Sequence, residues 1–318
     1  MTAWFAPKRD REGAFTARLR SHDRVQARDE HGFIVVAVLW IIAALATLAS
    51  IYAIYVANSA TRLGVSSDRL KADALISGAL ELTAYRLITA DQRTRPTPGA
   101  FSIRMGRAKV AVEYRSETAR IDLNVAPKPL LAGLFSSLGA GSVEALYFAD
   151  RIIGWRTQGE GAGEADEVTA YRTAGLTHRP RRGPFAHVAE LWLVLGLPPH
   201  LVERALPHVT VFSGRPDVNV LQASPEVLAA LPGMTPERLH TILAQRNRDP
   251  YNDQAVTAIL GSAQGAGLGD TAKATRVLVQ VDFDNGRRAN ADVIILPVED
   301  GDEPFRVLSW QDDFDALE

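Results

Sequence analysis

The sequence predicts an α+β protein in which one long N-terminal helix packs on an antiparallel sheet and a large all-helical domain interrupts that sheet. Three observations predict this class: an uncharged apolar run near the N-terminus, β-like alternation both early and late in the chain, and helical spacing with short Pro/Gly breaks between them. Because antiparallel strands need neighbours, helices between two sets of strands indicate a domain inserted into one sheet.

The apolar run covers residues 33–57, and no Asp, Glu, Lys or Arg occurs from Gly32 to Thr61. About 25 residues at 1.5 Å each give a helix of roughly 37 Å, which spans the ~30 Å hydrocarbon core of a bilayer. The run is too long for the apolar region of a secretory signal peptide. Residues 1–31 carry seven Lys/Arg and five Asp/Glu, which favours a cytoplasmic N-terminus. We therefore expect a single-pass anchor with the rest of the chain outside the cytoplasm.

Composition limits what the exported part can be. The 318 residues include no Cys, with 35 basic and 37 acidic side chains and a net charge of −2. Without disulfides, the exported part must be stabilised by hydrophobic cores, and its length is sufficient for two domains. The near-neutral charge argues against a dedicated nucleic-acid-binding protein, which normally carries a basic face.

The helical spacing continues beyond the membrane from Asn58 to Thr94, and the two Pro and one Gly of Arg95–Gly99 end it. This continuation is expected to be an amphipathic stem that packs on the sheet. Alternating β-like residues then occur on both sides of the helical middle. The expected strands are 101–105, 109–114, 275–283, 291–296 and 305–310.

Residues 121–270 form the predicted helical insert. Its clearest predicted helices are Ser142–Trp155, Pro184–Leu195, Pro199–Leu206, Ser224–Leu231 and Pro236–Asn247. Its last part, 261–269, is Gly-rich and flexible by composition, and it lacks the Lys-Ser/Thr of a phosphate-binding loop.

An internal repeat occurs in the insert. Residues 122–125 and 217–220 share the pattern D-x-N-V, and matched leucines follow each copy if the second copy contains two extra residues. In the second copy Ser224 and Pro225 have the pattern of a helix start, and Leu231–Pro236 has that of a hairpin between helices. The insert is therefore expected to contain helix-hairpin-helix-like repeats.

Catalytic motifs are missing from the sequence. The seven His show no H-E-x-x-H spacing, no G-x-S-x-G occurs, and there is no Cys. We therefore expect a protein that is not an enzyme.

Four features together resemble one family. They are Gly32-Phe33 ahead of a long apolar helix, the two D-x-N-V segments, the block from Tyr171-Arg172 to Glu190-Leu191, and the closing Phe305–Trp310. From about Gly32 to Trp310 the chain resembles the K-type minor pseudopilins of type II secretion (general secretion pathway protein K). The resemblance implies a pilin-like α/β fold and a role at the tip of the secretion pseudopilus, in its assembly and in protein export across the outer membrane.

The resemblance also implies a division of the chain and a location. Prepilin peptidase would cleave between Gly32 and Phe33 and leave an N-methylated Phe33. The expected parts are a leader at 1–32, a transmembrane part at 33–57, a pseudopilin domain at 58–120 and 271–318, and an insert at 121–270. The protein would be a single-pass protein of the bacterial inner membrane, with its C-terminal domains in the periplasm.

Most pilin-like proteins carry Glu at the fifth mature position, where this chain has Ala37. The K-type family characteristically lacks that Glu, which fits a tip subunit, because a carboxylate without a neighbour above it would be an uncompensated charge in the bilayer. The leader departs from the usual pattern: Arg28-Asp29-Glu30-His31 precedes Gly32, whereas pilin leaders place a base close to the Gly.

Calcium is a further possibility that the resemblance implies. Family members bind it in an acidic loop, which corresponds here to residues 155–167 with Glu164, Asp166 and Glu167 as candidate ligands. Relatives place Asp just after the Trp, where this chain has Thr157 and Gln158. A solvated acidic loop explains the same residues.

The partners implied by the resemblance are the I- and J-type minor pseudopilins, the major pseudopilin, prepilin peptidase and the inner-membrane assembly platform. The alternative is a membrane-anchored helix-hairpin-helix protein of DNA binding or uptake, in which hairpin amides would contact phosphate and Arg238, Arg246 and Arg248 would supply charge. Thr235 stands at the second Gly position of the usual hairpin, so nucleic acid is the less favoured partner.

Overall fold

The computed structural model describes residues 30–90, 98–158, 162–249, 253–261, 265–267, 274–298 and 303–314. Its contacts divide the chain into two compact units, Met1–Ser66 and Ser67–Glu318. The fold combines helices with an antiparallel sheet, and its N-terminal helix is apolar, as the sequence predicts.

Helix α1 runs from Glu30 to Thr89. In the second unit one face of this helix is buried, because small and aliphatic residues recur at helical spacing. These buried residues are Ala72, Ile76, Ala79, Leu80, Ala84 and Leu87. The expected helix end at Thr94 lies in the segment 91–97, outside the described residues.

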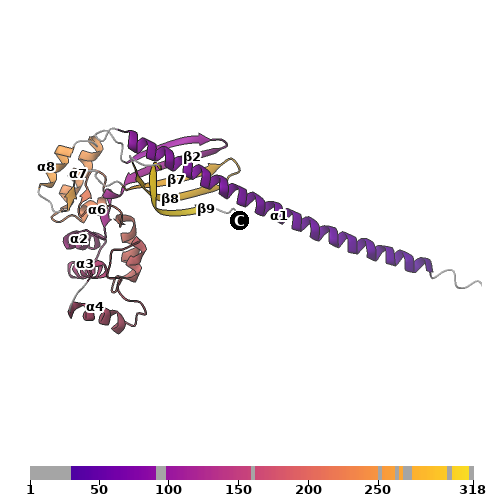
Figure 1. Ribbon diagram of the computed structural model, residues 1–318, viewed down its shortest axis with the longest axis horizontal. Helices are drawn as coiled ribbons and strands as arrows, with labels where there is room; N and C mark the ends of the chain where they lie inside the picture. The colour runs from indigo at the N-terminus through magenta and orange to yellow at the C-terminus, as the bar shows by residue number, and fades with distance from the viewer. Residues whose placement is uncertain are drawn as a thin grey trace, which may run out of the picture. The chain divides into compact units, whose positions relative to one another are not determined.

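Five strands form the sheet: β1 (Gly99–Met105), β2 (Ala108–Ser116), β7 (Thr275–Phe283), β8 (Arg288–Pro297) and β9 (Phe305–Phe314). Their spatial order is β1-β2-β7-β8-β9, and every neighbouring pair is antiparallel. The prediction that two early and three late strands share one sheet is confirmed. Alternate residues of β2, β7 and β8 form one core with the buried face of α1. Figure 1 shows these strands side by side, with the last part of α1 beside them.

The chain leaves and re-enters the sheet at adjacent points. Ser116 at the end of β2 pairs with Thr275 at the start of β7, and Glu117 N donates a 3.0 Å hydrogen bond to Ala274 O. All residues between these points therefore form an excursion from one pair of neighbouring strands.

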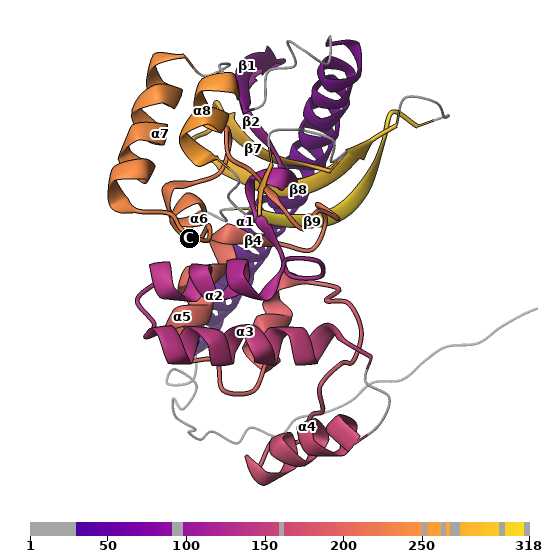
Figure 2. The same cartoon turned by 90° about the vertical axis from the view of Figure 1, so that its left-hand side faces the viewer.

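The excursion is built from helices and short strands around a separate hydrophobic core. Its α-helices are α2 (Lys128–Ser137), α3 (Ser142–Arg156), α4 (Ala162–Thr173), α5 (Pro199–Ala205), α6 (Pro225–Ala229), α7 (Pro236–Arg248) and α8 (Asp253–Leu260). Its 3-10 helices are η1 (Glu117–Ala119), η2 (Val188–Leu193) and η3 (Leu206–His208). Two parallel strand pairs complete it: β3 (Ile121–Asp122) with β4 (Val209–Thr210), and β5 (Val218–Asn219) with β6 (Ala266–Gly267). In Figure 2, as in Figure 1, α4 lies at the end of this group farthest from the sheet.

The predicted helix Pro184–Leu195 is wrong, because only η2 is helical there. The side-chain amide of Asn124 binds both backbone groups of Phe185: Asn124 Oδ1 accepts from Phe185 N at 2.6 Å and Asn124 Nδ2 donates to Phe185 O at 3.1 Å. Glu190 Oε1 accepts from Ala186 N at 3.1 Å. Side chains therefore satisfy the backbone groups of Phe185 and Ala186 that an α-helix would pair with each other's turns, and no run of α-helical hydrogen bonds forms here.

Two helices were not expected. The prediction of a loop at 155–167 is wrong, because α3 continues to Arg156 and α4 begins at Ala162. Helix α8 lies in a stretch for which no helix was predicted.

The structure aligns the internal repeat differently from the sequence pattern. Asp122 corresponds to Asn219 rather than to Asp217, because each stands in a short parallel strand and accepts from the backbone N–H two residues later. Ala126 N donates to Asp122 O, and Ala223 N donates to Asn219 O, both at 2.9 Å. Each repeat therefore starts with the same turn, and no extra residues are needed in the second copy.

Helices α2 and α6 of the two repeats touch at Gly133. A Cβ at this position would lie 1.9 Å from Ala230 O. We predict that Gly133→Ala lowers the stability of the protein by about 1–3 kcal/mol through overpacking, although Ala is the better helix former. The measurement is the thermal unfolding midpoint of the full chain in detergent. Gly183→Ala is the matched control, because a Cβ there meets nothing within 4 Å; equal midpoints for the two variants would contradict the prediction.

Candidate functional site

The first candidate is the apolar part of α1. Within the described residues, one helix is long and apolar enough to cross a membrane, at Phe33–Ser59. Its side chains are exposed, with Trp40 at 73%. Exposed apolar side chains on this scale are stable only in a non-aqueous environment. The segment therefore fits a single-pass membrane anchor.

The predicted processing site lies in the first turn of this helix. Phe33 is 76% exposed, Ala37 is partly buried, and the surroundings of Gly32 lie outside the described side chains. Cleavage between Gly32 and Phe33 stays a prediction.

The calcium candidates Glu164, Asp166 and Glu167 all fall on α4, so they belong to a helix and not to a loop. Their side chains lie outside the described set. In the part of the chain that is described, no group of three or more His, Asp or Glu is placed to hold a metal ion.

Two of the three arginines considered for phosphate binding are bound to the protein itself. The Arg238 guanidinium donates to Gly233 O at 3.1 Å and to Ile259 O and Leu260 O at 3.0 Å each. It thereby satisfies carbonyls at the C-terminal end of α8 and holds α7 against that helix.

Arg246 acts in the same way, because its guanidinium donates to Ala223 O at 2.7 Å, and burial lowers its pKa. In the first repeat Arg156 donates to Leu123 O at 2.6 Å and to Ala126 O at 2.7 Å. Since Ala126 and Ala223 are equivalent positions, each repeat uses one arginine from its second helix to hold the turn before its first helix. The sequence signal for this role was an Arg near the end of each second helix, and it was missed.

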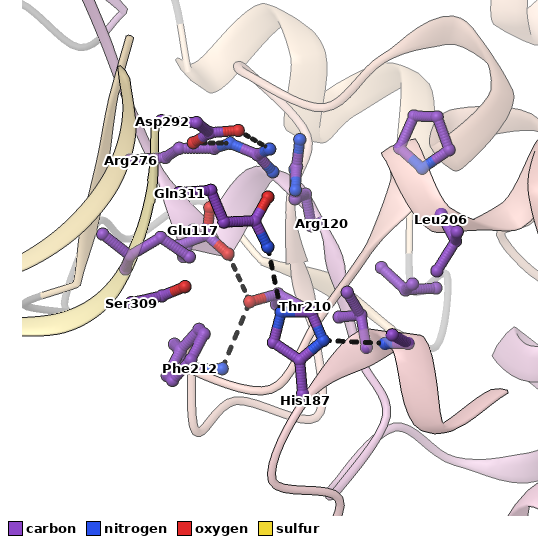
Figure 3. A pocket seen from close by; sticks show the side chains of 15 residues that line it. Glu117, Arg120, His187, Leu206, Thr210, Phe212, Arg276, Asp292, Ser309 and Gln311 are labelled. Carbon is purple, nitrogen blue, oxygen red and sulfur yellow. Dashed lines mark hydrogen bonds and ion pairs between the residues drawn. The ribbon is translucent and has the colours of Figure 1, made fainter. Parts of the chain in front are cut away.

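A cleft of about 430 Å³ lies where the helical part meets the sheet. Polar side chains reach it from both sides, as Figure 3 shows. They are Glu117, Arg120, His187, Thr210, Arg276, Asp292, Ser309 and Gln311. The sequence pattern indicates no role for any of them, because they come from six separate segments of the chain.

A hydrogen bond joins the two sides of the cleft, because Gln311 on β9 bonds the His187 ring at 3.2 Å. Within the helical part, Thr210 Oγ1 donates to Glu117 Oε2. On the sheet side Arg276 and Asp292 form a two-bonded ion pair between β7 and β8. The helical part is therefore attached to the sheet by polar contacts around a cavity.

The helical part also exposes large apolar side chains at the start of α3 and in η2. Val143 is 82% exposed, and Leu146, Tyr147, Trp192 and Leu193 are each between 42% and 47% exposed. Such residues are typical of protein interaction surfaces.

Comparison with known proteins connects this architecture to a family. Two models of the family described as type II secretion system (T2SS), protein K match the chain, over residues 113–214 and 218–281. Together they cover just over half of the sequence. No curated protein matches.

A solved structure shows a similar fold. It is described as the crystal structure of the GspK-GspI-GspJ complex from the type 2 secretion system of enterotoxigenic Escherichia coli. The match has a TM-score of 0.53 and 15% sequence identity, and it covers 78% of this chain and 98% of that one. At this identity the match supports the fold, and the two family models carry the assignment: the chain belongs to the type II secretion system protein K family.

Proposed function

We propose that this protein is a minor pseudopilin at the tip of the type II secretion pseudopilus, where it contributes to pseudopilus assembly and to protein export across the outer membrane. The observation that carries the proposal is the match of two protein K family models, one after the other, to the helical insert and the strands that flank it. The family is a component of a secretion system, so the proposed role is structural.

The proposed location follows from α1. Prepilin peptidase removes residues 1–32 and leaves a methylated Phe33 at the cytoplasmic face of the inner membrane. Residues 33–57 then span the bilayer, and the domains after them lie in the periplasm. The charge-free segment Phe33–Ser59 and the basic excess before it support this topology.

The proposed domain organisation has a pseudopilin domain at 58–120 and 271–318 and an insert at 121–270. Two separate hydrophobic cores support it, one between α1 and the sheet and one among the helices. The repeats of the insert are proposed to be helix-hairpin-helix-like units kept for packing. Arginine bonds to carbonyls at Ala126 and Ala223 support a packing role over phosphate binding.

The insert is proposed to cap the filament. By the scaling for compact domains, roughly 150 residues have a radius of gyration of about 15 Å, which makes the protein much wider than a pilin stem. A further subunit then has no space to dock above it. Ala37 in place of the usual Glu supports the same position, since a tip subunit has no upper neighbour to pair with a carboxylate.

The proposed partners are the I- and J-type minor pseudopilins, the major pseudopilin, prepilin peptidase and the assembly platform. The similar structure is described as a complex of three such proteins. On the stem part of α1, Leu70 is 69% exposed and Tyr85 is 63% exposed, away from the buried face. Long pilin-like helices bury such apolar side chains against one another.

We predict that Leu70→Asp combined with Tyr85→Asp weakens co-purification of the detergent-solubilised full chain with the I- and J-type proteins by about tenfold or more, because each carboxylate would have to be desolvated at the helix contact. Glu81→Gln, at another exposed position of the stem, is the control. Recovery of the double variant with both partners at the level of the control would show that the stem is not the contact surface.

A further inference from the structure

The cleft between the helical part and the sheet contains two charged groups whose bonding capacity is unused. Its walls come from the segments around Glu117 and Arg120, from residues 187–189 and 206–212, and from the sheet. The volume of about 430 Å³ is enough for a group the size of one or two amino acid residues.

The first unused group is a carboxylate oxygen of Glu117. This residue is fully buried. Its Oε2 accepts from Thr210, whereas its Oε1 has no hydrogen-bond partner among the described residues. A buried carboxylate oxygen without a donor is costly, so this oxygen is a position at which a bound N–H group would be stabilised.

The second unused group is the guanidinium of Arg120. Within the described part of the chain it makes no side-chain hydrogen bond and no ion pair. In Figure 3 it lies beside the guanidinium of Arg276, which donates from Nε and Nη2 to Asp292. Burial lowers the pKa of Arg120 to about 10 and Glu117 opposes that shift, so the group is still a cation at neutral pH. A planar cation with free donors in a partly buried place is the preferred partner of a carboxylate.

The cleft also has apolar walls. Its apolar lining residues are Val188, Ala189, Leu206, Pro207, Val209, Phe212 and Ile294. This lining suits an aliphatic side chain and not a second charge. A ligand that matches Arg120, Glu117 Oε1 and these apolar walls therefore has a carboxylate, an adjacent N–H donor and an apolar side chain.

We propose that this cleft binds the carboxylate of an apolar α-amino acid unit, with the carboxylate on Arg120 and the adjacent N–H on Glu117 Oε1. Two sources share this chemistry: a free amino acid and the C-terminal residue of a polypeptide. Capture of a terminal carboxylate by protein donors is a known recognition mode. The proposal does not depend on the position of the protein in a filament.

The test is calorimetric titration of the full chain in detergent with four probes: leucine, N-acetyl-leucine, the tripeptide Ala-Ala-Leu and the C-terminal amide of that tripeptide. We expect the tripeptide acid to bind about tenfold or more tightly than its amide, because only the acid gives Arg120 a bidentate charged partner. Binding of leucine as tight as that of the tripeptide would identify a free amino acid as the ligand. Binding of N-acetyl-leucine and the tripeptide without leucine would identify a polypeptide C-terminus.

Variants test the residues. Arg120→Gln should remove the preference for acid over amide, and Arg107→Gln, at an exposed position in the β1–β2 turn, should keep it. Because Arg120→Gln can disturb the fold, Ser309→Phe is a second variant that fills the cleft from β9; it should abolish binding at an unchanged thermal unfolding midpoint. The proposal is overturned if no acid binds, if acid and amide bind equally, or if Ser309→Phe binds as the unsubstituted protein does.

Discussion

Substitution of Gly32 by Val will leave residues 1–32 attached to the mature chain. Gly32 stands directly before the apolar run, and a peptidase that accepts a residue without a Cβ at this point excludes a branched side chain. The retained segment carries seven basic and five acidic side chains. Moving these charges into a bilayer or an apolar helix bundle costs several kcal/mol each, so the unprocessed chain will not enter a filament and secretion will fail. Mass spectrometry of the membrane-extracted protein gives the N-terminus directly.

Two controls define this result. His31→Ala changes the neighbouring leader residue and should still give a methylated Phe33 N-terminus. The unsubstituted chain should lose residues 1–32 only in cells with active prepilin peptidase. An intact leader in the unsubstituted chain in such cells, or normal processing of Gly32→Val, would refute the proposed site.

Deletion of the helical insert will leave the rest of the protein folded but will abolish secretion of substrate. The structure specifies where to join the chain: Ser116 and Thr275 are paired residues of neighbouring strands, so an Asn-Gly turn between them makes a hairpin of favoured geometry. Both the sheet and the buried face of α1 keep their own core, and we expect this shortened chain to fold. It lacks the proposed cap and the exposed apolar surface around Val143, so we expect secretion of substrate to be lost.

The measurement is the yield of secreted substrate and the filament length in cells that make only the shortened chain, at the abundance of the full chain. Circular dichroism with a cooperative thermal transition shows whether the shortened chain folds. Gly183→Ala in the full chain is the matched control, because it alters the insert without a steric clash. Normal secretion and normal filament length with a folded, insert-free protein would refute the capping role.

Local sequence pattern predicted the sheet and the helical stem well. The strand expected at 275–283 has the observed bounds of β7, because alternation of apolar and polar residues is a direct consequence of one buried face. Helix α3 also begins at the predicted Ser142 and ends one residue after the predicted Trp155. The residue pattern within each of these elements is sufficient to specify its secondary structure.

Other elements depend on contacts from distant parts of the chain. Residues 184–195 have helical spacing, yet the Asn124 side chain, about sixty positions away, binds the backbone N–H and carbonyl of Phe185. Likewise, Arg238 and Arg246 are candidates for phosphate binding by sequence, yet both guanidinium groups donate hydrogen bonds to backbone carbonyl oxygens of the protein. Sequence spacing does not show which buried carbonyl a side chain will satisfy.

The sequence by itself determined the membrane-length helix, the split sheet, the helical insert and the resemblance to protein K, because charge-free length and side-chain alternation are local properties of a chain. Only the tertiary structure decided that Asp122 corresponds to Asn219, and that Glu117 and Arg120 face a cleft with unused hydrogen-bonding capacity. Both depend on segments about a hundred or more residues apart being brought together, and that arrangement is set by how the two cores pack and not by any one segment's pattern.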